Sequence, residues 1–361
     1  MEFSALTTLR VGGPIARLVE PATRDELVEA TLAAWGEPEN WMILGGGSNL
    51  LVSDDGVDGT VIRVGHRGIE RASDGVPRIR VEAGEPWDAV VAFAVEHGLA
   101  GIEALSGIPG TAGAAPIQNI GAYGQQLSDV LVAIDFLDFT TGEVLTLPAD
   151  ELELGYRSSA LKSGRLGVVL SLELELRDES GQSAPVRYGQ LASALGVETG
   201  ARAGLAQVRD AVLALRRSKG MVLDPADADS VSAGSFFTNP IVSESFARTL
   251  PSDAPRYPTE PEEEPRVFPL GAEVPVTPPA SGEFMVKLSA AWLIERAGIA
   301  RGFALPGSRA AISSKHTLAL TNRGGATAAD IAQLAGFVQT RVESEFGVRL
   351  QPEPVLVGLE L

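Results

Sequence analysis

The sequence contains no cysteine, only 3 histidines and no long apolar run. The lack of cysteine excludes disulfides, thiolate metal ligands and a cysteine nucleophile. The histidines are scattered, so we predict no bound metal. The longest apolar stretch, around residues 89–95, is far too short to cross a bilayer, and no signal peptide is recognisable. We therefore expect a cytoplasmic protein without membrane insertion.

Positive charge is also scarce. The 361 residues include 29 Lys and Arg against 47 Asp and Glu, a formal net charge of -18. Such a chain repels nucleic acid and anionic membranes unless its cations gather at one site, so no nucleic-acid partner is expected. The hydrophobic fraction of 45% suits an ordinary globular protein, and the length allows two or three packed units.

Local signals mark the first elements of the chain. Thr23 has the character of a helix N-cap, and Gly36 is a natural end for the helix that follows it. The short apolar run over residues 41–44 predicts a buried strand.

The rest of the chain alternates predicted helices and strands, and it shows no internal repeat. The apolar residues 355–361 are expected to form a final strand that pairs back with the first unit. The acidic, proline-rich residues 251–282 predict an extended loop. Further helices are expected at residues 86–97, 205–217, 289–297 and 327–346, and further strands at residues 60–64, 78–81, 130–139, 143–147, 168–176 and 317–321.

A glycine-rich run directly follows the predicted strand at residues 41–44. It consists of Gly45, Gly46, Gly47, Ser48 and Asn49. Consecutive glycines let backbone N–H groups approach an anionic ligand, and the serine and asparagine add donors. A tight structural turn explains the run equally well. The run does not match the phosphate-binding nucleotide loop, and no G-x-G-x-x-G opens a helix here.

A second glycine-rich stretch covers residues 107–124. Its small residues and scattered prolines favour neither a regular helix nor a central strand. They suit a backbone that wraps closely around a bulky, flat ligand. A loose surface loop is the alternative, which the near absence of charge disfavours.

These blocks together resemble the UDP-N-acetylenolpyruvoylglucosamine reductase family. The resemblance rests on the run 45–49, on Ile108-Pro109-Gly110-Thr111, and on the blocks at 118–124, 156–159, 234–240 and 352–353, which occur in the family's order over nearly the whole chain. Each block is weak alone, and their order is specific. Tyrosines in the blocks around Tyr188 and Tyr257 point to the subtype with a tyrosine-bearing substrate loop.

The resemblance implies an α+β fold. A vanillyl-alcohol-oxidase-type FAD-binding domain would consist of two lobes, residues 1–67 (joined by 352–361) and 68–218. A third α+β lobe, residues 219–351, would bind substrate. NADPH would reduce bound FAD, which would then reduce the enolpyruvyl group of UDP-N-acetylenolpyruvoylglucosamine to give UDP-N-acetylmuramate for peptidoglycan synthesis.

The resemblance also assigns residues. As catalytic groups it implies Arg157 to stabilise an enolate-like charge, Glu353 as its protonated or hydrogen-bonded partner, and Ser235 as proton donor. Substrate-binding candidates are Tyr123, Tyr188, Lys219, Asn239 and Tyr257. Cofactor-binding candidates are Gly45, Gly46, Gly47, Ser48, Asn49, Pro109, Gly110, Thr111, Gly113, Ala114, Gly121 and Arg216.

Other interpretations stay open at this point. Taken singly, Ser235 suits a turn, Arg157 a surface ion pair and Lys219 a helix C-terminus. An oxidase of the same fold often attaches flavin through cysteine or histidine, which the glycine-rich blocks lack. A flavin or nucleotide-sugar binding protein without catalysis is the second rival. Pro354 departs from the family pattern and could shift Glu353.

Overall fold

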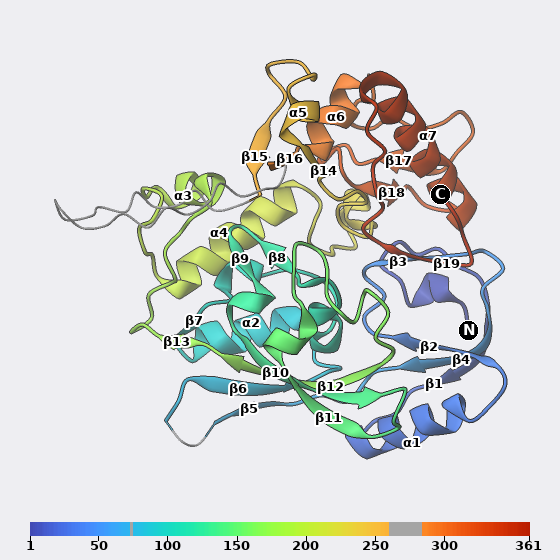
Figure 1. Cartoon of the computed structure of the whole chain (residues 1–361), viewed down its shortest axis with the longest axis vertical. Helices are drawn as coiled ribbons and strands as arrows, with labels where there is room; N and C mark the ends of the chain where they lie inside the picture. The colour runs from blue at the N-terminus through green and yellow to red at the C-terminus, as the bar shows by residue number, and fades with distance from the viewer. Residues whose placement is uncertain (73–74, 260–283) are drawn as a thin grey trace, which may run out of the picture.

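The computed structural model describes residues 1–72, 75–259 and 284–361, so most of the acidic segment predicted as a loop at 251–282 lies outside the described residues. Figure 1 shows the chain as three packed groups of helices and strands. None of the helices in the described ranges has both the length and the apolar character needed to cross a membrane.

The first group is a parallel three-stranded sheet, ordered β1-β4-β2, with one helix. Thr23 caps that helix through a capping box with Glu26, which confirms the predicted start. The strand predicted at residues 41–44 exists, but its expected burial is wrong: only Leu44 is buried, because the strand also borders a cavity. The elements are β1 (Ile15–Val19), α1 (Arg24–Trp35), β2 (Asn40–Leu44) and β4 (Val57–Arg63), preceded by a short 3-10 helix, Phe3–Ala5.

The C-terminal segment returns to this first group, as predicted. β19 (Val355–Val357) pairs in parallel with β3 (Leu50–Val52). The strand is shorter than the predicted range 355–361, since it ends at Val357. The pairing places Glu353 next to the first glycine-rich run, since Val355 N donates to Asn49 O at 3.0 Å.

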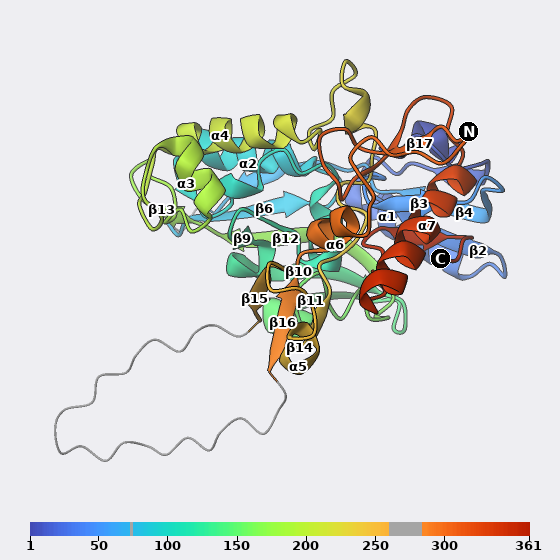
Figure 2. The ribbon, with the colours of Figure 1, turned by 90° about the horizontal axis from the view of Figure 1, so that it is seen from above.

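The second group is a five-stranded sheet ordered β11-β10-β12-β6-β5, in which all neighbours are antiparallel. Helix α2 lies between this sheet and helix α4 (Figure 2). Pro86 caps α2 and is not its first helical residue. The elements are β5 (Ile69–Arg71), β6 (Arg78–Glu82), α2 (Trp87–Glu96), β7 (Leu99–Ala100), β10 (Leu131–Asp138), β11 (Val144–Pro148), β12 (Gly167–Glu175), β13 (Arg177–Asp178), α3 (Gly189–Leu195) and α4 (Leu205–Ser218).

The stretch 107–124 forms neither an α-helix nor a central strand, in agreement with its composition. It contains a 3-10 helix, Ala112–Gln118, and a two-residue strand, β8 (Gly121–Ala122), paired with β9 (Gln125–Gln126). Ala112 and Ala115 are buried against the core of the second group. The stretch is therefore packed into the protein and is not a loose surface loop.

The third group combines two small antiparallel sheets with helices. Thr327 caps the long helix α7 through a capping box with Asp330. The strand predicted at 317–321 is misplaced, because a tight turn occupies its first part: Ala319 N donates to His316 O. The elements are β14 (Ile241–Ser243), α5 (Glu244–Ala247), β15 (Arg256–Pro258), β16 (Met285–Leu288), α6 (Ala290–Arg296), β17 (Ala310–Ile312), β18 (Leu320–Asn322) and α7 (Ala328–Phe346).

One carboxylate joins the first two groups. Asp135 on β10 accepts from Arg24 of α1 at 2.7 Å and from Arg80 of β6 at 2.5 Å. Burial raises the pKa of Asp135, but hydrogen bonds from Arg80, Arg24 and Thr146 outweigh it and lower the pKa to about 2.

Asp135→Asn should therefore destabilise the protein by about 1–3 kcal/mol at neutral pH, since two arginines lose a charged partner. Because the folded pKa lies below the ordinary value of 3.8, the stabilisation is complete above that pH and is lost as pH falls toward about 2. Chemical unfolding at pH 7 and pH 3 measures both effects. Glu37→Gln, at the exposed Arg17 pair, is the control and should stay within about 0.5 kcal/mol. Equal losses in the two variants would contradict the assignment.

Candidate functional site

A cavity of about 840 Å³ lies where the three groups meet. Both glycine-rich segments line it, together with side chains from distant parts of the chain. Five of these side chains are charged or reactive: Arg157, Lys162, Arg216, Ser235 and Glu353. The structure thus brings the three residues predicted as catalytic to the predicted cofactor loops. All the predicted cofactor residues, from Gly45 to Arg216, lie on its wall.

The two glycine-rich segments touch each other along one wall. A Cβ added to Gly46 would lie 2.8 Å from the Cα of Gly110, and one added to Gly45 would lie 2.8 Å from Thr111 Oγ1. Ser48 Oγ donates to Pro109 O at 3.1 Å. Glycine is needed here because two backbones pack against each other, a reason that the sequence alone did not reveal. Ser48 uses its hydroxyl for this packing.

Three residues that line the cavity have a buried polar atom with no partner among the described residues. The atoms are Arg216 Nε, Thr111 Oγ1 and Trp87 Nε1. Arg216 Nη2 donates to Met221 O at 3.0 Å, and burial lowers the pKa of the guanidinium. An unpaired buried cation costs free energy, so an anionic ligand in the cavity would stabilise Arg216. Asn49 is already engaged, because its Nδ2 donates to Gln118 Oε1 at 2.9 Å.

Arg157 and Glu353 form an ion pair at the cavity. Arg157 Nε lies 3.2 Å from Glu353 Oε1, and the side chains are 24% and 13% exposed. Arg157 Nη2 also donates to Gly121 O at 2.9 Å. The φ of Arg157 is 54°, a left-handed conformation that is uncommon for arginine and that the surrounding contacts must hold.

Burial raises the pKa of Glu353, while the charges of Arg157 and Lys162 act in the opposite direction. Lys162 lines the same cavity, and its Nζ donates to Arg157 O at 3.2 Å. Its pKa is lowered by burial and by Arg157. The sequence analysis did not include Lys162 among the site residues, although it lies shortly after the block that begins at Tyr156.

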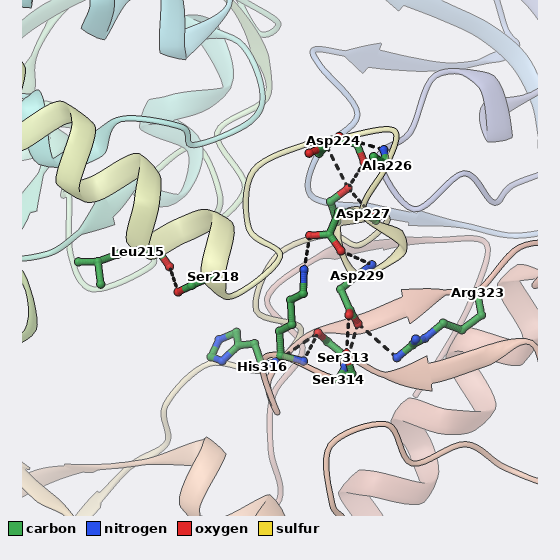
Figure 3. Close-up of polar contacts among 12 residues, drawn as sticks. Leu215, Ser218, Asp224, Ala226, Asp227, Asp229, Ser313, Ser314, His316 and Arg323 are labelled. Atoms are coloured by element: carbon green, nitrogen blue, oxygen red, sulfur yellow. Dashed lines mark hydrogen bonds and ion pairs between the residues drawn. The ribbon is translucent and has the colours of Figure 1, made fainter. Parts of the chain in front are cut away.

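The segment that carries Ser235 is anchored at its start by a charged cluster, shown in Figure 3. Asp229 accepts from Ser314 N at 2.8 Å and from Ser314 Oγ at 2.6 Å, and it pairs with Arg323 at 3.2 Å. At its end, Glu353 N donates to Phe236 O at 2.8 Å. Phe236, the residue directly after Ser235, is therefore bonded to the backbone of Glu353.

The predicted substrate residues do not all gather at this cavity. Tyr123, Tyr188 and Lys219 form one cluster: the two rings are T-shaped at 5.5 Å, and Lys219 Nζ lies 5.6 Å from the Tyr123 ring. Burial, followed by Arg216, lowers the pKa of Lys219. Of the two cavities described, Lys219 lines neither.

Asn239 and Tyr257 lie elsewhere. Asn239 borders a second cavity of about 780 Å³, which Arg157 and Lys162 also line, but its Oδ1 accepts from Ala290 N at 2.9 Å. Tyr257 on β15 is 51% exposed. Both remain candidates for substrate binding, and a ligand would have to contact them from the protein surface.

His316 is a further residue that the sequence analysis did not select. Its ring points away from Asp229, toward the helix of Leu215 and Ser218 (Figure 3). Burial lowers the pKa of His316 to about 4, helped by the charges of Lys219, Arg301 and Arg216. The signal in the sequence that could have singled out His316 is that the chain contains only 3 histidines.

Comparisons with known proteins agree with this geometry. Residues 224–357 match the family described as "UDP-N-acetylenolpyruvoylglucosamine reductase, C-terminal domain", and residues 15–148 match "FAD binding domain". The UDP-N-acetylenolpyruvoylglucosamine reductase from Leifsonia xyli is 62% identical to this chain, and the match covers 99% of this chain and 98% of the relative. Its counterpart from Saccharopolyspora erythraea is 51% identical over 99% of this chain and 95% of the relative.

A solved structure shows the same similarity. The crystal structure of UDP-N-acetylenolpyruvylglucosamine reductase from Thermus caldophilus superposes with a TM-score of 0.64 at 25% sequence identity. The match covers 99% of this chain and 97% of that one.

The position of His316 leads to a prediction about pH. The folded pKa of about 4 lies below the ordinary value of 6.5, so protonation favours the unfolded chain and stability falls as pH drops between these values. His316→Gln cannot take up this proton, so the variant should gain stability relative to wild type from pH 6.5 to pH 4. Thermal unfolding of both proteins across this range measures the difference. A difference that stays constant with pH would show that His316 is not held neutral.

Proposed function

The chain belongs to the UDP-N-acetylenolpyruvoylglucosamine reductase family, and from that premise we propose how its cavity serves the reaction. The protein is an FAD-dependent oxidoreductase that uses NADPH to reduce UDP-N-acetylenolpyruvoylglucosamine to UDP-N-acetylmuramate, in peptidoglycan synthesis. The predicted family, cofactor and α+β fold are confirmed. An oxidase or a non-catalytic binding protein is not supported by relatives named as reductases.

FAD fits the larger cavity. The buried Arg216 Nε and Thr111 Oγ1 without partners call for a ligand that is anionic and accepts hydrogen bonds, as a pyrophosphate does. The glycine backbones of the run 45–47 and of Gly110 line this cavity, and a Cβ on any of them would collide with a neighbouring protein segment. Bound FAD supplies the hydride chemistry. The residues proposed to hold it are the cofactor-binding candidates assigned from the resemblance.

The Arg157–Glu353 pair, in one cavity with Ser235, is the observation that carries the catalytic assignment. Reduction of the enolpyruvyl group places negative charge near its carboxylate. A fixed guanidinium in a partly buried site stabilises that charge without having to reorganise. The contacts from Glu353 and from Gly121 O fix the direction of Arg157.

Ser235 is proposed to supply the proton that completes the reduction at C2. A serine hydroxyl is a weak acid in water, so the donor must be held beside the charged group that receives the proton. Its segment is anchored on both sides, which supports this role. Burial raises the pKa of Glu353, and when protonated its carboxyl would donate a hydrogen bond to the same anion.

The substrate-binding set remains part of the proposal. Lys219 lies near Tyr123, and the charge of Lys219 acts on His316, so a cationic region adjoins the end of α4. Such a region suits a diphosphate in a protein of net charge -18. Tyr188, Asn239 and Tyr257 would contact the remainder of the nucleotide sugar.

The unit boundaries and the cellular location also belong to the proposal. Buried clusters support the lobes 1–67 with 352–361, 68–218 and 219–351 only in part, because Leu27 and Ile62 of the first pack in the cluster of the second, and Leu9 and Leu51 pack with the third. A cytoplasmic location follows from the substrates, because NADPH and nucleotide sugars are cytoplasmic metabolites. Cell fractionation tests it.

Visible spectroscopy of the purified protein tests the function. We expect a yellow protein whose flavin band is bleached by anaerobic NADPH and restored by UDP-N-acetylenolpyruvoylglucosamine. A folded protein that is colourless and does not take up FAD would contradict the proposal.

Ser235→Ala should keep the bleaching by NADPH and slow the restoration of colour by roughly 10²–10⁴-fold, the usual contribution of a positioned proton donor. Stopped-flow absorbance separates the two half-reactions. Ser193→Ala, at an exposed position of α3, is the matched control and should leave both rates unchanged. If the Ser235 variant restores its colour at the wild-type rate, another group is the proton donor.

A further inference from the structure

We infer that Thr8 is a positioning residue of this enzyme. Its hydroxyl fixes the position of the Ser235 segment relative to the first glycine-rich run. The inference rests on the function proposed above, because it concerns where the proton donor stands relative to the cofactor cavity.

Thr8 contacts both sides of this junction. Its Oγ1 lies 2.6 Å from Ser232 O, three residues before Ser235, and 3.4 Å from Ser48 O. A hydroxyl has one proton, so the short contact to Ser232 is the hydrogen bond. Thr8 N donates to Gly47 O at 3.1 Å. One residue thus ties the cofactor run to a segment more than two hundred positions away in the chain.

The Ser235 segment is also held by the third group, because Ser232 forms a β-bridge with Thr321 and Asn322 N donates to Val231 O at 3.0 Å. Downstream, Phe236 N donates to Leu318 O at 2.7 Å. Gly234 has a φ of 75° and open space where a Cβ would stand, and its N donates to Ser232 Oγ at 3.2 Å, within the same segment. In the described part of the chain, no backbone hydrogen bond involves Ala233 or Ser235. Among the described residues, the bond from Thr8 to Ser232 O is therefore the last hydrogen bond from a side chain of another segment before the serine.

Thr8 itself has little freedom to move. Asn322 Nδ2 donates to Leu9 O at 3.1 Å and to Arg10 O at 3.3 Å. The Leu9 side chain is fully buried in the core of the third group. A β-branched side chain also has restricted rotation about χ1. The hydroxyl is consequently held by its surroundings and can act as a fixed point for Ser232.

Loss of this hydroxyl should disturb one half of the reaction. Without it, the Ser232 carbonyl loses its bond to the residue beside the cofactor run, and the Ser235 segment can shift relative to that run. A misplacement of about 1 Å can cost roughly 10²-fold in rate. Reduction of the flavin by NADPH does not need the serine proton, whereas reduction of the substrate does. A hydrogen bond with a merely structural role would lower stability without separating the two half-reactions.

The test compares Thr8→Val with Thr7→Val in the FAD-loaded enzyme. Thr7 is a neighbour whose Oγ1 donates to Val11 O at 3.0 Å, so its variant loses a similar bond without touching Ser232. Thr8→Val should slow substrate reduction by about 10- to 100-fold and leave flavin reduction unchanged. Its solvent deuterium isotope effect on substrate reduction should rise, because proton transfer limits the rate more strongly. Thr8→Ser, which keeps the hydroxyl, should restore most of the rate.

Wild-type enzyme is assayed first. If it fails to reduce the substrate, the proposed function fails, independently of Thr8. If wild type is active but both valine variants behave alike, or if Thr8→Val slows both half-reactions equally, the positioning role is overturned. Should Thr8→Val fail to fold, Thr8→Ala removes the same hydroxyl without a steric conflict. The same measurements are then made on that variant.

Discussion

The close approach of two backbones, at Gly46 and Gly110, is the constraint on which the site depends. A Cβ on Gly46 would lie 2.8 Å from the Cα of Gly110, so the two glycine-rich segments come together only without side chains. Their contact forms one wall of the cavity that also holds Arg216 and the Arg157–Glu353 pair. The fold serves this contact: the first run follows the end of β2, and the second is packed on the core of the five-stranded sheet.

Charge is distributed to suit the same cavity. Although the net charge of the chain is -18, the cations Arg157, Lys162 and Arg216 all line this cavity. Burial disfavours the charged forms of Lys162 and Arg216 and lowers the pKa of each. That cost is offset when an anion binds, so the site is arranged for ligands that bring negative charge. An acidic surface elsewhere does not compete, because exposed charges are screened over about 10 Å.

Sequence reasoning predicted what depends on local chemistry. The cap at Thr23 was correct because the hydrogen bonds of a capping box lie within four residues. The burial of residues 41–44 was wrong, because a strand beside a cavity has the composition of a core strand. The Arg157–Glu353 contact could be expected only from resemblance, since it joins residues far apart in the chain. Thr8, Lys162 and His316 escaped notice because their importance lies in tertiary neighbours, which no local pattern encodes.

The affinity of the apoprotein for FAD, measured by flavin fluorescence in a Gly46→Ala variant, tests the central claim most directly. The added methyl group must push the two glycine-rich segments apart, so we predict weaker FAD binding in a protein whose circular dichroism stays native. Gly36→Ala is the control, because a Cβ at Gly36 meets nothing closer than 3.5 Å. Wild-type affinity in a folded Gly46→Ala protein would contradict the account, since the backbone contact would then be unnecessary for holding the cofactor.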